Sequence, residues 1–185
     1  GLLKLLSVLS EIDNGTAFDD ISERLKVLGW FDSLRIVKDS AMSPIGMDIS
    51  DNFTSDSGKI FDHRSANEGF LFLIFYYALL STDLTPSFFA IDNIDTSLNP
   101  KLCVELMKQL ADLAHKNNKQ VLLTTHNPAI LDGMNLEDDD QRLFVVSRSL
   151  TGQTRIKRVK KPKNIDLKLS EMFMRGVLGG LPKGF

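Results

Sequence analysis

The chain has 185 residues, of which 43% are hydrophobic and 25% are charged, a composition typical of folded globular proteins. It excludes disordered and fibrous classes, and the length predicts one domain, or one large lobe of a domain, with a substantial core. The 22 Lys and Arg residues against 24 Asp and Glu residues give a formal net charge of -2. No overall basic field for nucleic acid is therefore expected, although a local basic patch remains open.

The single cysteine, Cys103, lies in an apolar-periodic stretch and has no disulfide partner within the chain. We expect a buried thiol and a reducing, cytoplasmic setting. The longest apolar run, residues 69–80, is shorter than the ~20 residues that span a bilayer, so no membrane partner is expected. The apolar start of the chain lacks the basic region of a signal peptide. Because it opens on Gly inside an apolar pattern, we expect a piece of a longer protein.

Residues 1–61 are expected to form an irregular segment joined to the main domain. Apolar spacing predicts a helix over 17–29 that ends at Gly29. Residues 34–37 suggest a strand, and the turn-forming residues of 50–59 predict a loop.

Residues 62–150 alternate helices with short apolar strands. The pattern predicts helices over 66–80, 100–115 and 128–131, and buried strands over 88–91 and 121–125. Short apolar strands separated by helices are typical of an α/β fold with a parallel sheet flanked by helices on both faces.

Residues 151–185 are expected to form a basic strand and a C-terminal helix. A strand over 143–146, a turn at Thr151-Gly152 and a strand over 154–159 predict a β-hairpin, followed by a helix over 170–178. The second strand and its continuation are rich in cations: Arg155, Lys157, Arg158, Lys160, Lys161 and Lys163. A solvated edge strand is the favoured interpretation, and contact with nucleic-acid phosphates is the alternative.

Polar residues follow both buried strands of the central part. Asp92 and Asn93 come after the first strand, and His126 and Asn127 come after the second. Ligands of open parallel sheets bind beyond the carboxyl ends of the strands, so these residues form a candidate site. The alternative is structural, with Asp92 capping a loop and His126 satisfied in the core.

Three motifs in order resemble the ATPase head of the ABC/SMC-like class, and more narrowly the bacterial AAA-family ATPases related to OLD-type proteins, many of which occur in anti-phage defence systems. The segment from Ile91 to Pro100 aligns without gaps to the Walker B and D-loop pattern of that family. The segment from Thr124 to Pro128 looks like its switch-histidine loop, and Asn67-Glu68-Gly69 takes the place of its signature turn. The match covers about residues 62–150, which implies the C-terminal lobe of such a head.

The resemblance implies ATP and Mg²⁺ as cofactors and gives each residue a role. Asp92 would hold Mg²⁺, and His126 would contact the γ-phosphate or the attacking water. The signature turn, residues Asn67, Glu68 and Gly69, would face the γ-phosphate of a nucleotide bound by a second copy of the head. Leu98 and Asn99 of the D-loop would lie at the homodimer interface. An effector protein is the further partner implied.

Two departures from the family pattern stand out. The position after the Walker B aspartate, where the family has a catalytic Glu, is Asn93. A carboxamide orients water but accepts no proton, so slow hydrolysis is expected unless Asp95, Glu68 or His126 substitutes. Asp95 is the best placed by sequence, although a solvated loop carboxylate is the favoured interpretation. In the signature turn Asn67 replaces the usual Ser and can still donate to a phosphate.

The second departure is that the sequence contains no Gly-x-x-x-x-Gly-Lys-Ser/Thr motif. Gly58-Lys59 is the nearest imitation, and it is rejected because Ile60 and Phe53 stand where Ser/Thr and the first Gly belong. The Walker A half is thus absent, and the chain alone is expected to be inactive and to bind ATP poorly.

Three functional hypotheses follow. The first is part of an ATP hydrolase that couples nucleotide-dependent dimerisation to an effector. The second is a nucleotide-gated scaffold with little turnover, because Asn93 replaces the catalytic Glu. The third is an α/β interaction domain whose motifs are coincidental.

Overall fold

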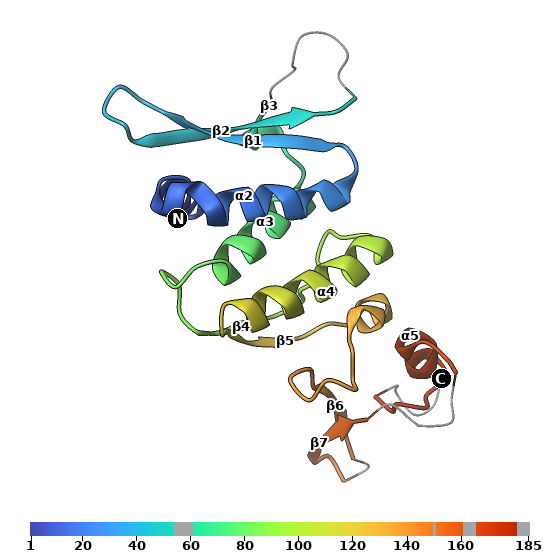
Figure 1. Ribbon diagram of the computed structural model, residues 1–185. Helices are drawn as coiled ribbons and strands as arrows, with labels where there is room; N and C mark the ends of the chain where they lie inside the picture. The colour runs from blue at the N-terminus through green and yellow to red at the C-terminus, as the bar shows by residue number, and fades with distance from the viewer. Residues whose placement is uncertain (54–60, 150, 161–165, 181–185) are drawn as a thin grey trace.

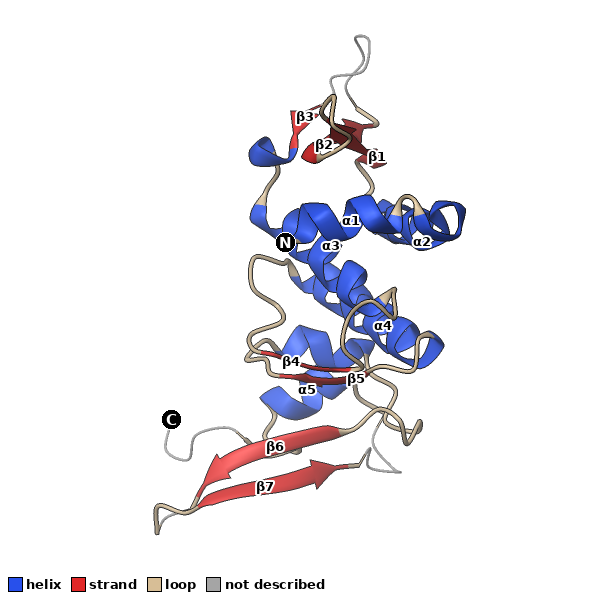
Figure 2. Ribbon diagram, turned by 90° about the vertical axis from the view of Figure 1, so that its left-hand side faces the viewer, coloured by secondary structure: helices blue, strands red, loops and turns tan. Residues whose placement is uncertain are grey.

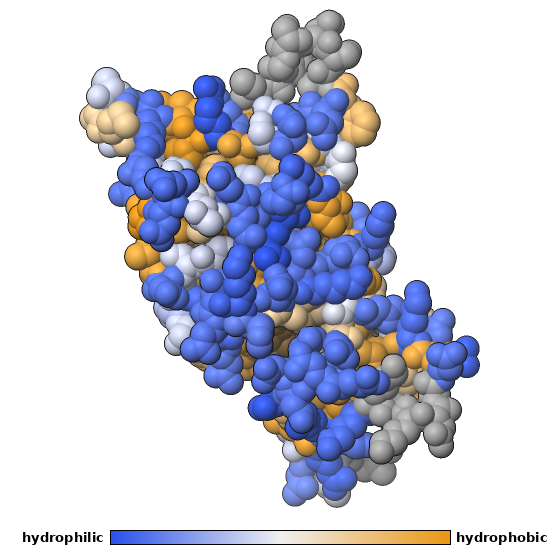
Figure 3. Space-filling model, viewed as in Figure 1, coloured by the Kyte–Doolittle hydropathy of each residue, from blue (hydrophilic) through white to orange (hydrophobic). Residues whose placement is uncertain are grey.

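The computed structural model describes residues 1–53, 61–149, 151–160 and 166–180. Its elements are stacked along one direction, from an antiparallel sheet at one end, through a helical layer and a parallel pair of strands, to a β-hairpin at the other end (Figure 1). In the same view hydrophilic side chains cover the middle of the molecule, over α2 and α4, and hydrophobic ones show mainly towards the ends (Figure 3). No described helix is long and apolar enough to cross a membrane.

The N-terminal part is more regular than predicted. Two helices, α1 (Leu2–Leu9) and α2 (Thr16–Leu25), pack under a three-stranded antiparallel sheet of β1 (Phe31–Lys38), β2 (Pro44–Asp51) and β3 (Phe61–Asp62). Short 3-10 turns follow the helices at Ile12–Gly15 and Lys26–Leu28, and Gly29 ends the second turn with a left-handed φ of +76°, as its position predicts.

Strand β2 was not predicted. Pro44, Gly46 and Asp48 are poor strand formers, so only the buried Met47 and Ile49 show the alternation of a half-buried strand. Ser50 and Asp51, expected in a loop, end this strand, and residues 54–60 of that loop lie outside the described residues.

The parallel sheet of the central part is confirmed. Helix α3 (Glu68–Leu80) follows a 3-10 turn (His63–Ser65) and leads to β4 (Phe88–Ile91), and α4 (Pro100–Lys116) connects β4 to β5 (Gln120–Leu123). The two strands pair in parallel, with Phe88 opposite Gln120 and Ile91 opposite Leu123.

One face of this sheet packs on the core and the other is exposed. Phe89, Ile91, Val121 and Leu123 pack against the hydrophobic core. On the opposite face Phe88 and Leu122 are 54% and 55% exposed. The sheet lies beside α4 (Figure 2), but within the described residues it is not covered on both faces as expected.

The C-terminal part contains the predicted hairpin, in which β6 (Leu143–Arg148) pairs antiparallel with β7 (Thr154–Val159). A 3-10 helix, η4 (Pro128–Gly133), precedes it, and α5 (Leu169–Met174) follows. Helix α5 is shorter than predicted, because Gly176 has a positive φ of +73° that breaks the helical path. The Asp132 carboxylate accepts hydrogen bonds from the backbone N–H and the hydroxyl of Ser170, which fastens α5 to η4.

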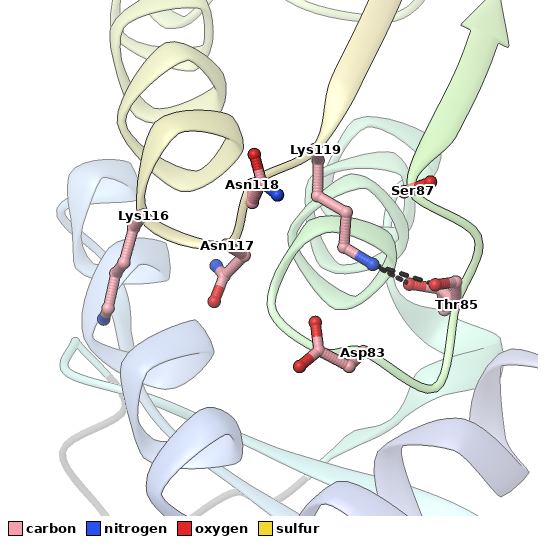
Figure 4. A pocket seen from close by; sticks show the side chains of 7 residues that line it. All are labelled: Asp83, Thr85, Ser87, Lys116, Asn117, Asn118 and Lys119. Atoms are coloured by element: carbon pink, nitrogen blue, oxygen red, sulfur yellow. Dashed lines mark hydrogen bonds between the residues drawn. The ribbon is translucent and has the colours of Figure 1, made fainter.

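A buried lysine joins the starting ends of the two parallel strands. Lys119 is 9% exposed. Its ammonium group donates to the Thr85 carbonyl at 2.9 Å and the Thr85 hydroxyl at 3.2 Å (Figure 4), and also to the Pro86 carbonyl at 3.2 Å. The Thr85 hydroxyl in turn donates to the Leu79 carbonyl near the end of α3. Because an ammonium group has three donors, all of them are satisfied here, and the buried charge is compensated without a carboxylate.

Lys119→Ala should therefore destabilise the chain by about 2–4 kcal/mol, since it removes charge-assisted hydrogen bonds and leaves polar groups of the β4 approach unpaired. Urea unfolding followed by circular dichroism measures this loss. The control is Lys116→Ala, three residues away and exposed, for which a change within ~0.5 kcal/mol is expected. Equal stability of the two variants would contradict the assigned role of Lys119.

Candidate functional site

The carboxyl ends of β4 and β5 are joined by a threonine hydroxyl. Thr124, the first residue after β5, donates through Oγ1 to the Asp92 carboxylate and accepts the Asn93 backbone N–H at 3.0 Å. The backbone continues the pairing, because Thr124 N–H donates to the Ile91 carbonyl and Ile94 N–H donates to the Thr124 carbonyl. The Asp92 carboxylate is thus fixed at the end of the sheet.

Asn93 has a left-handed backbone, with φ of +52°. Asparagine tolerates this conformation better than most residues other than glycine. Its amide Nδ2 lies 3.4 Å from the Asp92 carboxylate. The next residue, Ile94, is completely buried and holds the loop on the core while Asp92 and Asn93 stay exposed.

The loop after β5 is held by a second threonine. Thr125 donates through Oγ1 to the Asp95 carboxylate at 2.5 Å and accepts the Asn127 backbone N–H at 3.0 Å. The Asn127 side chain caps η4 through the Ala129 N–H, and its Nδ2 lies 3.5 Å from the Cys103 sulfur. His126 lies exposed between these two fixed neighbours.

Asp95 is half-buried, and its charge acts on two neighbouring groups of the core. Burial first, and then the negative charge of Asp95, raise the pKa of the Cys103 thiol and that of the Tyr76 hydroxyl. Cys103 is buried and free, which confirms the buried thiol expected from sequence.

The turn that opens α3 lies against the loop after β4. Asn67 caps α3, accepting the Phe70 N–H through Oδ1 at 2.8 Å, and so leaves its amide Nδ2 as the group able to donate to a ligand. The exposed Glu68 accepts a hydrogen bond from the Ser97 hydroxyl at 2.5 Å. Gly69 is buried, and a Cβ built on it would lie 2.6 Å from the Ser97 carbonyl oxygen, so only glycine allows this close approach.

Leu98 and Asn99 lie at the start of α4. Asn99 caps the helix by accepting the Leu102 N–H at 3.0 Å, and Pro100 occupies the first helical position. Leu98 is half-buried, and its Cδ2 comes close to the Cβ position of Gly69. Ser97, between these groups, has a left-handed φ of +62°.

The structure thus brings the predicted residues together in two groups. The first joins Asp92 and Asn93 to the loop that carries His126, and the second joins the turn 67–69 to Leu98 and its neighbours. Sequence reasoning missed Thr124, Thr125 and Ser97, whose hydroxyls make these links. The two threonines directly after an apolar strand could have indicated these links, but Thr124 and Thr125 were predicted to be the last residues of that strand.

Aromatic rings of the N-terminal part pack against the first turn of α3, next to the turn 67–69. Phe70, fully buried in the first turn of α3, has its ring 5.3 Å from that of Trp30 and 5.7 Å from that of Phe31, and Trp30 also contacts Phe61 at 6.1 Å. The antiparallel sheet thereby fixes the entry of α3.

The Asp92 carboxylate is a suitable ligand for a hard cation, but it does not form a complete metal site by itself. Within the described ranges no group of three or more His, Cys, Asp or Glu side chains forms a metal cage. Mg²⁺ commonly takes one or two carboxylates and completes its shell with water and substrate phosphates, so one exposed carboxylate fits a Mg²⁺–nucleotide but not a resident metal.

A surface pocket of about 590 Å³ lies at the other end of the strands. Its lining comes from the segments before β4 and β5 and from the end of α4: Asp83, Thr85, Ser87, Lys116, Asn117, Asn118 and Lys119 (Figure 4). Ligands of parallel sheets bind at the carboxyl ends, so this pocket is separate from the candidate site.

The basic strand is exposed for most of its length. Arg158 donates to the Asp139 carboxylate at 2.8 Å, and this hydrogen bond lowers the pKa of Asp139. The acidic run before β6 thus partly neutralises β7. Lys161 and Lys163 lie outside the described residues.

Gly69→Ala tests the close approach of α3 and the loop after β4. Alanine normally stabilises a helix relative to glycine, but here a loss of about 1–3 kcal/mol is expected, because the methyl group meets backbone. The matched control is Gly46→Ala in β2, where the nearest atom lies 3.8 Å from the new Cβ and stability should hold or rise slightly. Thermal melts of both variants make the comparison, and a stabilised Gly69→Ala would contradict the described contact.

Solved structures share this fold. A chain from work described as "Structural biochemistry of ATP-driven dimerization and DNA stimulated activation of SMC ATPases" is 12% identical, with a TM-score of 0.59, covering 93% of this chain and 94% of that one. The Smc head domain with a coiled coil and joint from Pyrococcus yayanosii is 14% identical, with a TM-score of 0.57, over 87% of this chain and 29% of that one. The Smc head domain from Pyrococcus furiosus bound to the C-terminal domain of ScpA is 13% identical, with a TM-score of 0.54, over 78% and 34%. The chain therefore spans about a third of the two Pyrococcus chains.

No curated protein matches the chain significantly. A family model does match, over residues 3–132, and its description is "AAA domain, putative AbiEii toxin, Type IV TA system". This segment takes in the antiparallel sheet, both parallel strands and the loops that carry Asp92 and His126. The family match covers more than half of the chain, which therefore belongs to this AAA-domain family, and the likeness to SMC heads shows a shared fold.

Proposed function

We propose that the chain supplies the Walker B, switch-histidine and signature side of an ATP site that a second segment or polypeptide completes. The observation that carries the proposal is the Asp92 carboxylate, held by Thr124 at the carboxyl end of a parallel strand whose neighbour delivers His126. This is the edge of a parallel sheet at which ligands bind.

Each residue has a chemical task in this proposal. Asp92 holds the Mg²⁺ that accompanies the nucleotide, and the ion supplies neutralisation of phosphate charge. His126, exposed on a loop fixed at both sides, donates to the γ-phosphate or to the attacking water. Backbone N–H groups of the turn 67–69, together with the free amide of Asn67, face a phosphate bound by another head.

Asn93 sets the expected rate. Its amide aligns water but accepts no proton, and its left-handed backbone suits asparagine. The proposed head therefore holds ATP for long periods and hydrolyses it slowly, which supports the nucleotide-gated scaffold as the second candidate function.

Two observations support completion by another surface. The six polar candidate residues are exposed: Asn67, Glu68, Asp92, Asn93, Asn99 and His126. In addition, among the described residues β4 and β5 form a sheet of two strands with one apolar face open, and so small a sheet needs further strands or cover to be stable. The phosphate loop and the missing cover are supplied together in this proposal.

The partners follow from the same reasoning. One solved relative is described as undergoing ATP-driven dimerisation, and another is bound to the C-terminal domain of ScpA. We infer that this chain likewise acts in a homodimer of heads, with ATP bound between them and an effector protein attached. A role in anti-phage defence and a cytoplasmic location are part of this proposal.

The chain alone should bind Mg²⁺–ATP more weakly than ~1 mM, a binding free energy of less than about 4 kcal/mol, because most phosphate contacts lie elsewhere. Isothermal titration calorimetry of the 185 residues measures this affinity. Tight, Mg²⁺-dependent binding that Asp92→Ala abolishes would refute the proposed division of the site.

Asn93→Glu, made in the assembly that also contains the phosphate loop, should raise ATP turnover by about 10²-fold or more, because it introduces a carboxylate able to accept a proton. Phosphate release is the measurement, and Asn93→Gln is the matched control, for which no gain is expected. No gain with Glu, together with loss of all turnover in Asp92→Ala, would show that another residue already acts as the base.

A further inference from the structure

Asp95 is linked to the switch loop, residues 124–127, by a single hydroxyl group. Thr125 Oγ1 donates to Asp95 Oδ1 at 2.5 Å and accepts the Asn127 N–H at 3.0 Å. The same hydroxyl therefore connects the residue before His126 with the residue after it, and connects both to Asp95. A hydroxyl that both donates and accepts has a fixed rotamer. The conformation at His126 is therefore tied to Asp95, which lies on the other strand's loop.

The Asp95 carboxylate accepts the Thr125 hydroxyl at 2.5 Å, whereas Asp92 and Asn93 are exposed. Asp95 is half-buried, and its charge acts on the interior groups of Cys103 and Tyr76. Cys103 contacts both loops, since its sulfur lies 3.9 Å from the Leu98 carbonyl and 3.5 Å from Asn127 Nδ2. A half-buried carboxylate that already accepts this hydroxyl is poorly placed to take a proton from water at the exposed site.

Glu68, another carboxylate near the site, is committed in a similar way. It accepts the Ser97 hydroxyl at 2.5 Å and so joins the turn 67–69 to the loop after β4. That loop contains two non-glycine residues with left-handed backbones, Asn93 and Ser97, each of which is unfavourable in isolation. Such a conformation persists only where surrounding contacts impose it, and the two carboxylate–hydroxyl bonds are among those contacts.

We propose that Asp95 is a positioning residue that acts through Thr125 to hold His126 in place, and not a replacement for the missing catalytic glutamate. The proposal rests on the proposed ATPase function for its catalytic meaning. The physical link itself exists without nucleotide and can be tested without it.

The single cysteine provides the first test. Cys103 is buried, so a thiol reagent such as dithionitrobenzoate reacts only when the two loops open or the chain unfolds. Thr125→Val and Asp95→Asn should each raise the labelling rate by about tenfold, since the first removes the hydrogen bond and the second removes its charge. The double variant should label no faster than the single ones, whereas Thr125→Ser, which keeps the hydroxyl, should label like the parent chain.

The control for general destabilisation is Thr85→Val. Thr85 also donates a part-buried hydroxyl hydrogen bond, to the Leu79 carbonyl, but at the opposite end of β4. Its labelling rate should rise only as far as its global stability falls. The link would be overturned if Thr125→Val labelled like the parent chain, or if its labelling rate rose no more than its loss of global stability predicts. It would also be overturned if the effects of the two substitutions multiplied in the double variant.

The second test separates positioning from proton transfer in the complete ATPase. If Asp95 acts through Thr125, then Asp95→Asn and Thr125→Val lower kcat by the same factor and leave the acid limb of the pH–rate profile in place. Thr125→Ser, which keeps the hydroxyl, then has the turnover of the parent assembly. If Asp95 is the base, Asp95→Asn alone removes the acid limb, and the proposal is wrong. Failure of the parent assembly to bind ATP would count against the proposed function, while the cysteine labelling would still decide the link.

Discussion

The parallel pairing of β4 with β5 is the interaction on which the rest of the candidate site depends. Its register, from Phe88 opposite Gln120 to Ile91 opposite Leu123, sets which residues emerge side by side at the carboxyl edge. Asp92 and Thr124 are the next pair in that register, and their side-chain hydrogen bond extends the ladder by one step. A slip of one residue would turn every side chain to the other face of the sheet and separate Asp92 from its hydroxyl partner. Lys119 secures the same register at the opposite end.

Sequence reasoning predicted the elements whose signals are local. Apolar runs predicted both parallel strands, and Pro100, a residue favoured at the first helical position, marked the start of α4. Strand β2 was missed because its pairing with β1, and not the propensity of Pro44 or Gly46, makes it a strand. The hydrogen bond of Asp95 could not be predicted, because its donor, Thr125, lies thirty residues later in the chain and is brought alongside only by the fold.

The likeness to SMC heads at 12–14% identity has a physical explanation. Few of the positions that define this fold require one residue type. The core needs apolar side chains of suitable volume, and many sequences satisfy that requirement. Gly69 is different, because the approach of the Ser97 carbonyl excludes even a methyl group. At Gly69 the fold therefore restricts the residue type more tightly than it does in the apolar core.

The helix caps around the site have a consequence for its electrostatic potential. Asn67, Asn99 and Asn127 each accept a backbone N–H at the start of a helix, and all three are amides. Aspartate would cap these helices about as well, and Asp62 does so at the 3-10 turn before Ala66. Three aspartates here would add three negative charges beside the Asp92 carboxylate and oppose the positive ends of the helix dipoles. Amide caps stabilise the helix starts without adding negative charge, and the edge of the sheet stays compatible with a polyanion.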